Sequence, residues 1–108
     1  MFSFLRALDR RDYESALHLV DQAPPGMGPA ELERAIRPLF ESGESMDLDQ
    51  AARSPTNTVI EHHGDFWSVT QSILVGGEVS EYFVKAHVDL TRSAAEHRVV
   101  LELEHVGA

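Results

Sequence analysis

Two short glycine-containing segments constrain the fold of this chain more than any other feature of its sequence. Gly64-Asp65 and Gly76-Gly77 each separate two stretches of extended-type sequence by two residues, which is the spacing of a tight β-hairpin. Because a two-residue turn fixes the register of its strands, the residues that share one face of the sheet can be deduced. We predict four antiparallel strands, over residues 56–62, 66–75, 79–90 and 97–106.

Both turns define the same inner face of the sheet. The first turn sets Thr58 opposite Gln71 and His62 opposite Trp67, and the second sets Gln71 opposite Tyr82. The two pairings place the same side chains of the middle strand on the inner face, which supports the assignment. In the last strand the inner residues are expected to be Val99, Leu101, Leu103 and His105.

Residues 1–43 show helical spacing instead. Apolar residues fall on one helical face in three groups: Phe2, Leu5 and Leu8; Tyr13, Ala16, Leu17 and Val20; and Leu32, Ala35, Ile36, Leu39 and Phe40. Asp12 is a suitable N-cap for the second helix, and Pro29 suits the first position of the third. Pro38 should kink that helix, and Gly43 should end it.

Helices that precede a sheet predict an α+β fold. A length of 108 residues suits one domain. We therefore expect the helical residues 1–43 to pack on one face of a curved four-stranded antiparallel sheet, which residues 56–106 form as a meander.

The charge of the chain argues against nucleic acid as a direct partner. The formal net charge is −9, and Lys85 is the only lysine. Nucleic-acid binders present a basic face that neutralises phosphates, and anionic lipid makes a similar demand. The chain has no cysteine, no apolar run of about 18 residues and no signal-peptide pattern, so we expect a cytoplasmic protein with no membrane span.

One polar row on the inner face is a candidate ligand site. Thr58, Gln71 and Tyr82 should lie side by side, with Trp67 as an aromatic wall. Convergent polar groups beside an aromatic ring are what a small-molecule pocket needs. The other interpretation is structural: Gln71 and Tyr82 satisfy each other or bond to backbone groups at the edge of the core. We favour it, because buried polar side chains usually have such partners.

The sequence predicts no catalytic residue, metal site or cofactor. His62 and His63 are adjacent in a strand and must point to opposite faces, so one ion cannot readily take both. No HExxH, GxSxG or GxxxxGK[ST] motif occurs. His87 and Asp89 share the outer face and could orient a base, although such a pair is more often solvated.

The outer face of the sheet is a candidate protein interface. Its expected apolar residues are Val59, Phe66, Leu74, Phe83, Val100 and Val106. Phe66, Phe83 and Val100 are the interface candidates among them, because a contiguous exposed patch marks an interaction site. Scattered exposure, or cover by the C-terminal tail, is the alternative. We favour a homodimer through this face over a different protein partner.

Three short motifs carry a resemblance to a known family. The chain reads DQAARSP at 49–55, FWSVTQ at 66–71 and VDLTRS at 88–93. These motifs resemble a bacterial domain of unknown function at the C-terminal end of Ski2-like DEAD/DEAH-box RNA helicases. The resemblance spans nearly the whole chain and implies an accessory domain that stands alone, without a helicase core and without its ATPase activity. It also leaves an RNA-associated module open, which the charge opposes.

The resemblance adds two candidate residues and one departure. Arg53 and Asp89 lie in its motifs and could line one mouth of the sheet with Trp67 and Gln71; we favour a simple Arg–Asp pair that fastens a loop. Residues 75–83 contain fewer acidic residues than the corresponding turn of the family pattern and lack its Trp. The order of helices and sheet is also similar to nuclear transport factor 2-like or cystatin-like rolls, which often dimerise and often enclose a pocket.

Two functions follow from these observations. The first is a dimeric, non-enzymatic accessory or interaction domain. The alternative is a small-molecule-binding or enzymatic roll with a pocket around Trp67, Gln71 and Tyr82. A packed inner face would favour the first function, and an open face lined by polar groups would favour the second.

Overall fold

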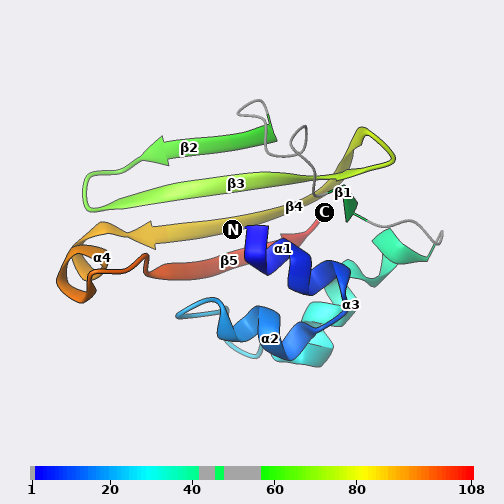
Figure 1. The fold of residues 1–108 in the computed structure, drawn as a ribbon, viewed down its shortest axis with the longest axis horizontal. Coiled ribbons are helices and arrows are strands. Elements are labelled where there is room, and N and C mark those ends of the chain that lie inside the picture. Colours follow the sequence, from blue (N-terminus) through cyan, green and yellow to red (C-terminus); the bar gives the residue numbers. More distant parts are fainter. Residues whose placement is uncertain (1, 42–45, 48–56) are drawn as a thin grey trace.

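A computed structural model of the chain describes residues 2–41, 46–47 and 57–108. Its helices are α1 (Phe2–Asp9), α2 (Tyr13–His18), α3 (Pro29–Phe40) and α4 (Leu90–Glu96). Its strands are β1 (Met46–Asp47), β2 (Thr58–His62), β3 (Phe66–Val75), β4 (Glu78–Asp89) and β5 (Leu101–Gly107). The predicted α+β architecture, with helices before an antiparallel sheet, is confirmed (Figure 1).

Within the described residues the sheet has five strands, one more than the sequence predicts. Its order is β1-β3-β4-β5, and β2 also pairs with β3. All of these pairings are antiparallel. Since β4 occupies one edge of β3, the short β1 and the longer β2 share the other edge, at opposite ends of β3.

The first hairpin has the predicted register. Thr58 lies opposite Gln71 and His62 lies opposite Trp67. The predicted pairing of Gln71 with Tyr82 is wrong, because Val84 lies opposite Gln71. A bulge in β4 causes the shift: the Ser80 hydroxyl donates to the Ile73 carbonyl at 2.6 Å and accepts from the Tyr82 N–H at 3.1 Å. The shift is two residues, so the inner and outer faces are retained.

A helix interrupts the predicted meander after β4. Leu90, expected at the end of the third strand, begins α4. A carboxylate oxygen of Asp89 accepts from the Arg92 N–H at 2.9 Å and caps the helix, and His97 ends it in the left-handed conformation with φ of 54°. The last strand therefore begins at Leu101 and not at His97.

The predicted inner face of the last strand is half right. Leu103 is buried and Leu101 is half-buried, but Val99 precedes β5 and is 66% exposed. A second bulge sets Leu103 opposite Ala86 and His105 opposite Lys85. The bulge adds one residue to β5, so the side chains after it point to the faces opposite to those that simple alternation predicts. As a result Val106 is buried on the inner face, and His105 lies on the outer face beside Lys85.

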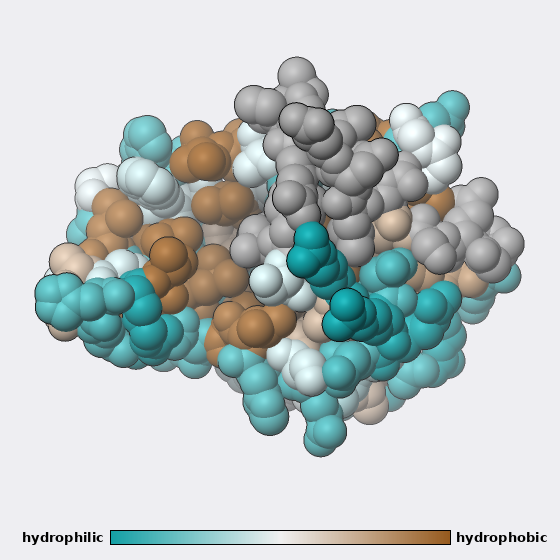
Figure 2. All heavy atoms as spheres, viewed as in Figure 1, coloured by the Kyte–Doolittle hydropathy of each residue, from teal (hydrophilic) through white to brown (hydrophobic). Residues whose placement is uncertain are grey.

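Helices α1 to α3 cover only part of the inner face. In Figure 1 they lie over the end of the sheet that carries β1, while the end that carries the β2–β3 turn and α4 is free of them. Figure 2 shows apolar atoms on that free part of the face. No helix among the described residues combines the length and the apolar character that a membrane crossing requires.

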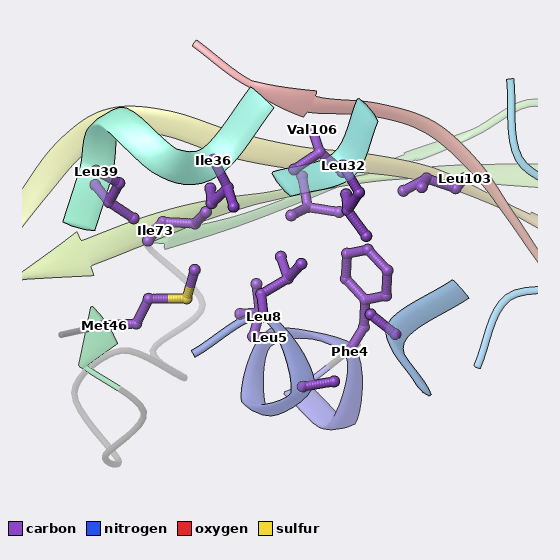
Figure 3. Packing of buried hydrophobic residues seen from close by; sticks show 13 residues of the cluster. Phe4, Leu5, Leu8, Leu32, Ile36, Leu39, Met46, Ile73, Leu103 and Val106 are labelled. Atoms are coloured by element: carbon purple, nitrogen blue, oxygen red, sulfur yellow. The ribbon is translucent and has the colours of Figure 1, made fainter. Parts of the chain in front are cut away.

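The core lies between these helices and the covered end of the sheet. Side chains of α1 point toward those of α3, with Ile73 of β3 and Val106 of β5 close by (Figure 3). Phe4, Leu8, Leu32, Ile36, Ile73 and Val84 are almost completely buried. Each such aliphatic or aromatic side chain contributes about 1.5–3 kcal/mol to folding through burial.

Local sequence signals explain where the helices begin. A carboxylate oxygen of Asp12 accepts from the Ser15 N–H at 3.3 Å and caps α2, as predicted. Pro29 is the first residue of α3, also as predicted, and the helix runs through Pro38 to Phe40. The predicted stop at Gly43 lies outside the described residues.

Candidate interaction surface on the sheet

Three rows of inner-face side chains run across β2, β3, β4 and β5. The first row is Thr58, Gln71, Val84 and Val106; the second is Ile60, Val69, Ala86 and Leu103; the third is His62, Trp67, Val88 and Leu101. The helices bury the first row beyond Thr58, because Gln71, Val84 and Val106 are each at most 4% exposed. The second and third rows extend out from under the helices.

We call Ile60, Trp67, Val69 and Val88 the open apolar surface. Ile60 is 51% exposed and Trp67 is 37% exposed, although both belong to the face that forms the core elsewhere. Val69 and Val88 are half-buried beside them. Leu19 and Val99 add further exposed apolar atoms to the chain. Figure 2 shows a broad apolar area on the part of this face that the helices leave free.

Gln71 forms structural hydrogen bonds. It is 1% exposed. The Thr58 hydroxyl donates to its side-chain oxygen, and its side-chain nitrogen donates to the Ser72 carbonyl at 3.0 Å. The structural interpretation of this polar row therefore describes Gln71 well, with Thr58 and Ser72 rather than Tyr82 as its partners. A buried amide held in this way fixes β2 against β3.

Tyr82 lies away from the other pocket candidates. It lines a hollow of about 340 Å³ between the end of α3 and the β3–β4 turn, together with Leu39 and Val79. The lining of this hollow contains neither Trp67 nor Gln71. The structure therefore does not bring the three predicted pocket residues together there.

Asp89 does not lie on the same face of the sheet as Trp67, which the predicted mouth requires. Arg53 lies outside the described residues. Asp89 pairs with Phe66 on the outer face, whereas Trp67 faces inward. Asp89 also lines a small outer hollow of about 160 Å³ with Asp65, Phe66, His87 and Glu102. Its carboxylate serves α4 as the N-cap.

Histidine rings cover the phenylalanines of the outer face. His63 and His87 lie 4.8 and 5.0 Å from the Phe66 ring, measured between ring centroids. His105 stacks on Phe83 at 4.7 Å. Both phenylalanines are half-buried, so this face presents imidazoles where an apolar patch was predicted.

Val100 is wrong as an interface candidate, because it is fully buried. Its N–H donates to the Ser93 hydroxyl at 2.9 Å, and its carbonyl accepts from the Asp89 N–H at 3.0 Å. These two bonds connect the residue just before β5 to α4 and to the end of β4. This burial was missed because helix α4 was not predicted from the sequence.

The paired histidines lie on opposite faces, as expected for neighbours in a strand. His62 lies 4.9 Å from Trp67 on the inner face, whereas His63 stacks on Phe66 on the outer face. On the outer face the Glu104 carboxylate lies 2.7 Å from the His87 Nε2 atom and 3.8 Å from the Lys85 ammonium. Within the described residues, no three His, Asp or Glu side chains are grouped to hold a metal ion.

An acidic residue after α2 ties that segment to β5. The Asp21 carboxylate lies 2.6 Å from the Arg98 guanidinium and accepts from the Leu101 N–H at 2.8 Å. The hydrogen bond from Arg98, followed by that from Leu101, lowers the pKa of Asp21 below its ordinary value. This contact holds the chain along the outer edge of β5.

These features define an α+β domain whose helices cover one end of one face of an antiparallel sheet. The family model described as Domain of unknown function (DUF3516) matches residues 1–106, and the chain belongs to this family. Searches of curated proteins and of solved structures return no match to the chain. The family description assigns no activity, so the function has to be argued from the site itself.

Proposed function

We propose that this chain is a non-enzymatic accessory domain that binds another protein through the open apolar surface. The observation that carries the proposal is the exposure of Ile60 and Trp67 on the face that forms the core elsewhere. Burial of apolar surface is favourable by about 25 cal/mol per Å², so an uncovered apolar area favours association. Tryptophan is also enriched among the residues that dominate the energy of protein interfaces.

The polar groups near this surface support binding over catalysis. Gln71 and Thr58 bond to each other, and Gln71 bonds to the Ser72 carbonyl. The His62 ring packs beside Trp67. A surface with this composition recognises a partner by shape and apolar contact. The ligand-pocket alternative has less support, since Tyr82 lines a hollow whose lining includes neither Trp67 nor Gln71.

The resemblance to helicase-associated domains suggests one class of partner. An accessory domain of this kind would bind a protein chain and would act on RNA only through that chain. The formal net charge of −9 supports this indirect role, because it opposes contact with phosphates. The cysteine-free composition is consistent with the cytoplasm, where we place the protein.

Native mass spectrometry of the gently purified protein tests this function. We compare the wild-type chain with Trp67→Ser and with Val79→Ser, whose side chain is 58% exposed at the far turn of the sheet. The wild type and Val79→Ser should retain a bound protein mass that Trp67→Ser loses. A small-molecule mass released on denaturation, or a protein mass other than that of a second copy of the chain that Trp67→Ser retains in full, would contradict the proposal.

A further inference from the structure

The two outer edges of the sheet differ in how they are closed. Along β5, the Asp21 N–H donates to the Leu101 carbonyl and the Leu103 N–H donates to the Gln22 carbonyl, each at 2.7 Å. Gln22 thereby forms a parallel bridge with Glu102. Along the other edge, β2 pairs only with β3 within the described part of the chain. One edge is therefore capped by a segment of the chain itself, and the β2 edge can accept a strand.

The hairpin geometry determines which backbone groups of β2 face outward. The His63 N–H donates to the Phe66 carbonyl at 2.9 Å, directly beside the two-residue turn. Bonded positions alternate along an antiparallel pair, so Glu61 and Val59 also bond toward β3. The N–H and C=O groups of Thr58, Ile60 and His62 consequently point away from β3, toward the open edge.

We propose that a second copy of this chain pairs with β2 in an antiparallel manner, with Ile60 of both copies at the two-fold axis. Ile60 would exchange two backbone hydrogen bonds with the partner's Ile60. Thr58 would do the same with the partner's His62, and His62 with the partner's Thr58, which gives about six bonds in all. This inference rests on the proposed function and names a second copy as one partner.

The side chains of β2 favour this register over its neighbours. With the axis at Ile60, the isoleucines meet on the inner face and Val59 lies opposite the partner's Glu61 on the outer face. An axis at Glu61 would set two carboxylates directly opposite each other, which is destabilising. An axis at Val59 would leave His62 without a partner among Thr58–His62. The strand is therefore complementary to itself in one register.

The pairing also extends the open apolar surface. The second inner row ends at Ile60 on the open edge and continues inward through Val69, Ala86 and Leu103. Pairing at Ile60 joins this row to the same row of the partner. The joined row is apolar from one end to the other. Ile60, which is 51% exposed in the single chain, would lie at its centre.

The absence of cysteine from the sequence allows a sharp test of the register. Val59 and the partner's Glu61 would form a non-hydrogen-bonded pair, with Cα atoms about 4.5 Å apart, which a disulfide can bridge. We mix Val59→Cys and Glu61→Cys chains in equal amounts, one carrying a mass tag, and oxidise them. The mixed dimer should cross-link at least tenfold more than either variant alone, since identical positions lie about 8 Å apart.

A charge substitution at the axis provides the second measurement. Sedimentation of the wild type and of Val79→Lys should show a dimer, whereas Ile60→Lys should raise the dissociation constant at least tenfold. A wild type that sediments as a monomer at every concentration would overturn the inference, and so would a mixture that cross-links no more than the single variants. Neither outcome would contradict the proposed function. That function depends on Trp67 of β3 and is tested separately, by native mass spectrometry of Trp67→Ser.

Discussion

The covered and the open parts of the inner face belong to the same strands and follow the same alternation of side chains. Under the helices, Ile73 and Val84 are at most 1% exposed. Toward the β2–β3 turn, Ile60 and Trp67 of the same face are 51% and 37% exposed. Alternation thus determines which face is apolar. The lengths and positions of the helices determine how much of that face becomes core.

The lengths of the elements explain the difference. Helix α3 and strand β4 have 12 residues each. A helix rises about 1.5 Å per residue and a strand about 3.3 Å, so α3 is about 18 Å long and β4 about 40 Å. Helices α1 and α2 are shorter still, with 8 and 6 residues. No single helix therefore covers the strands from end to end.

The largest expected effect is a difference in stability between isoleucine substitutions in the covered core and on the open apolar surface. Ile36→Ala, in the covered core, should lower the free energy of unfolding by about 2–5 kcal/mol, because it leaves a cavity. Ile60→Ala, on the open surface, should change it by less than ~0.5 kcal/mol, the range of exposed substitutions. Urea unfolding at low protein concentration measures both. Equal losses at the two positions would contradict the comparison.

A smaller loss of stability is expected at the boundary between the covered and the open parts of the inner face. Gln71→Leu removes the partner of the Thr58 hydroxyl and should cost about 1–3 kcal/mol without changing the fold. Adding Thr58→Val should recover part of that loss, because the hydroxyl is removed as well. Thermal unfolding of the single and double variants checks this coupling. Strictly additive losses would show that the two side chains do not act as a pair.

The smallest effect concerns Asp21, which closes the β5 edge. Its folded pKa is lowered, chiefly by the hydrogen bond from Arg98, so the ionised carboxylate stabilises the folded chain. That contribution is present above the ordinary pKa of 3.8 and is lost as the pH falls through the folded value. Asp21→Asn should cost less than ~1 kcal/mol at pH 7. The difference from the wild type should shrink toward pH 3, and a difference that grows would contradict this sign.

The sequence predicts the first hairpin because its register depends on a single turn. The Gly64-Asp65 turn and the alternation beside it place Thr58 opposite Gln71 and His62 beside Trp67, as the structure has them. Asp12 and Pro29 likewise act through neighbours in sequence. Features of this kind require no knowledge of the rest of the fold.

The two bulges were missed because they change the strand register without changing the alternation of apolar and polar residues in the sequence. Ser80 enters the β4 ladder through its hydroxyl, which alternation does not reveal. The extra residue in β5 exchanges His105 and Val106 between the faces. Helix α4 could have been found, since Asp89 precedes a short run of helix-forming residues as an N-cap.

The open surface could also have been predicted in part. The longest helix, α3, rises only about 18 Å, whereas β4 is about 40 Å long, so no single helix can cover the inner face from end to end. Which inner-face residues stay uncovered depends on where α1 to α3 dock. Trp67 was assigned to the inner face correctly, but its exposure required the three-dimensional arrangement.

The most direct test of the central claim is photo-cross-linking in the cells that produce the protein. A photoreactive phenylalanine analogue replaces Trp67 on the open apolar surface, and a second chain carries it at Val79, which is 58% exposed but lies at the opposite end of the sheet. The account predicts a discrete protein adduct from position 67 and little from position 79. No protein adduct at position 67, or the same adducts from both positions, would contradict it.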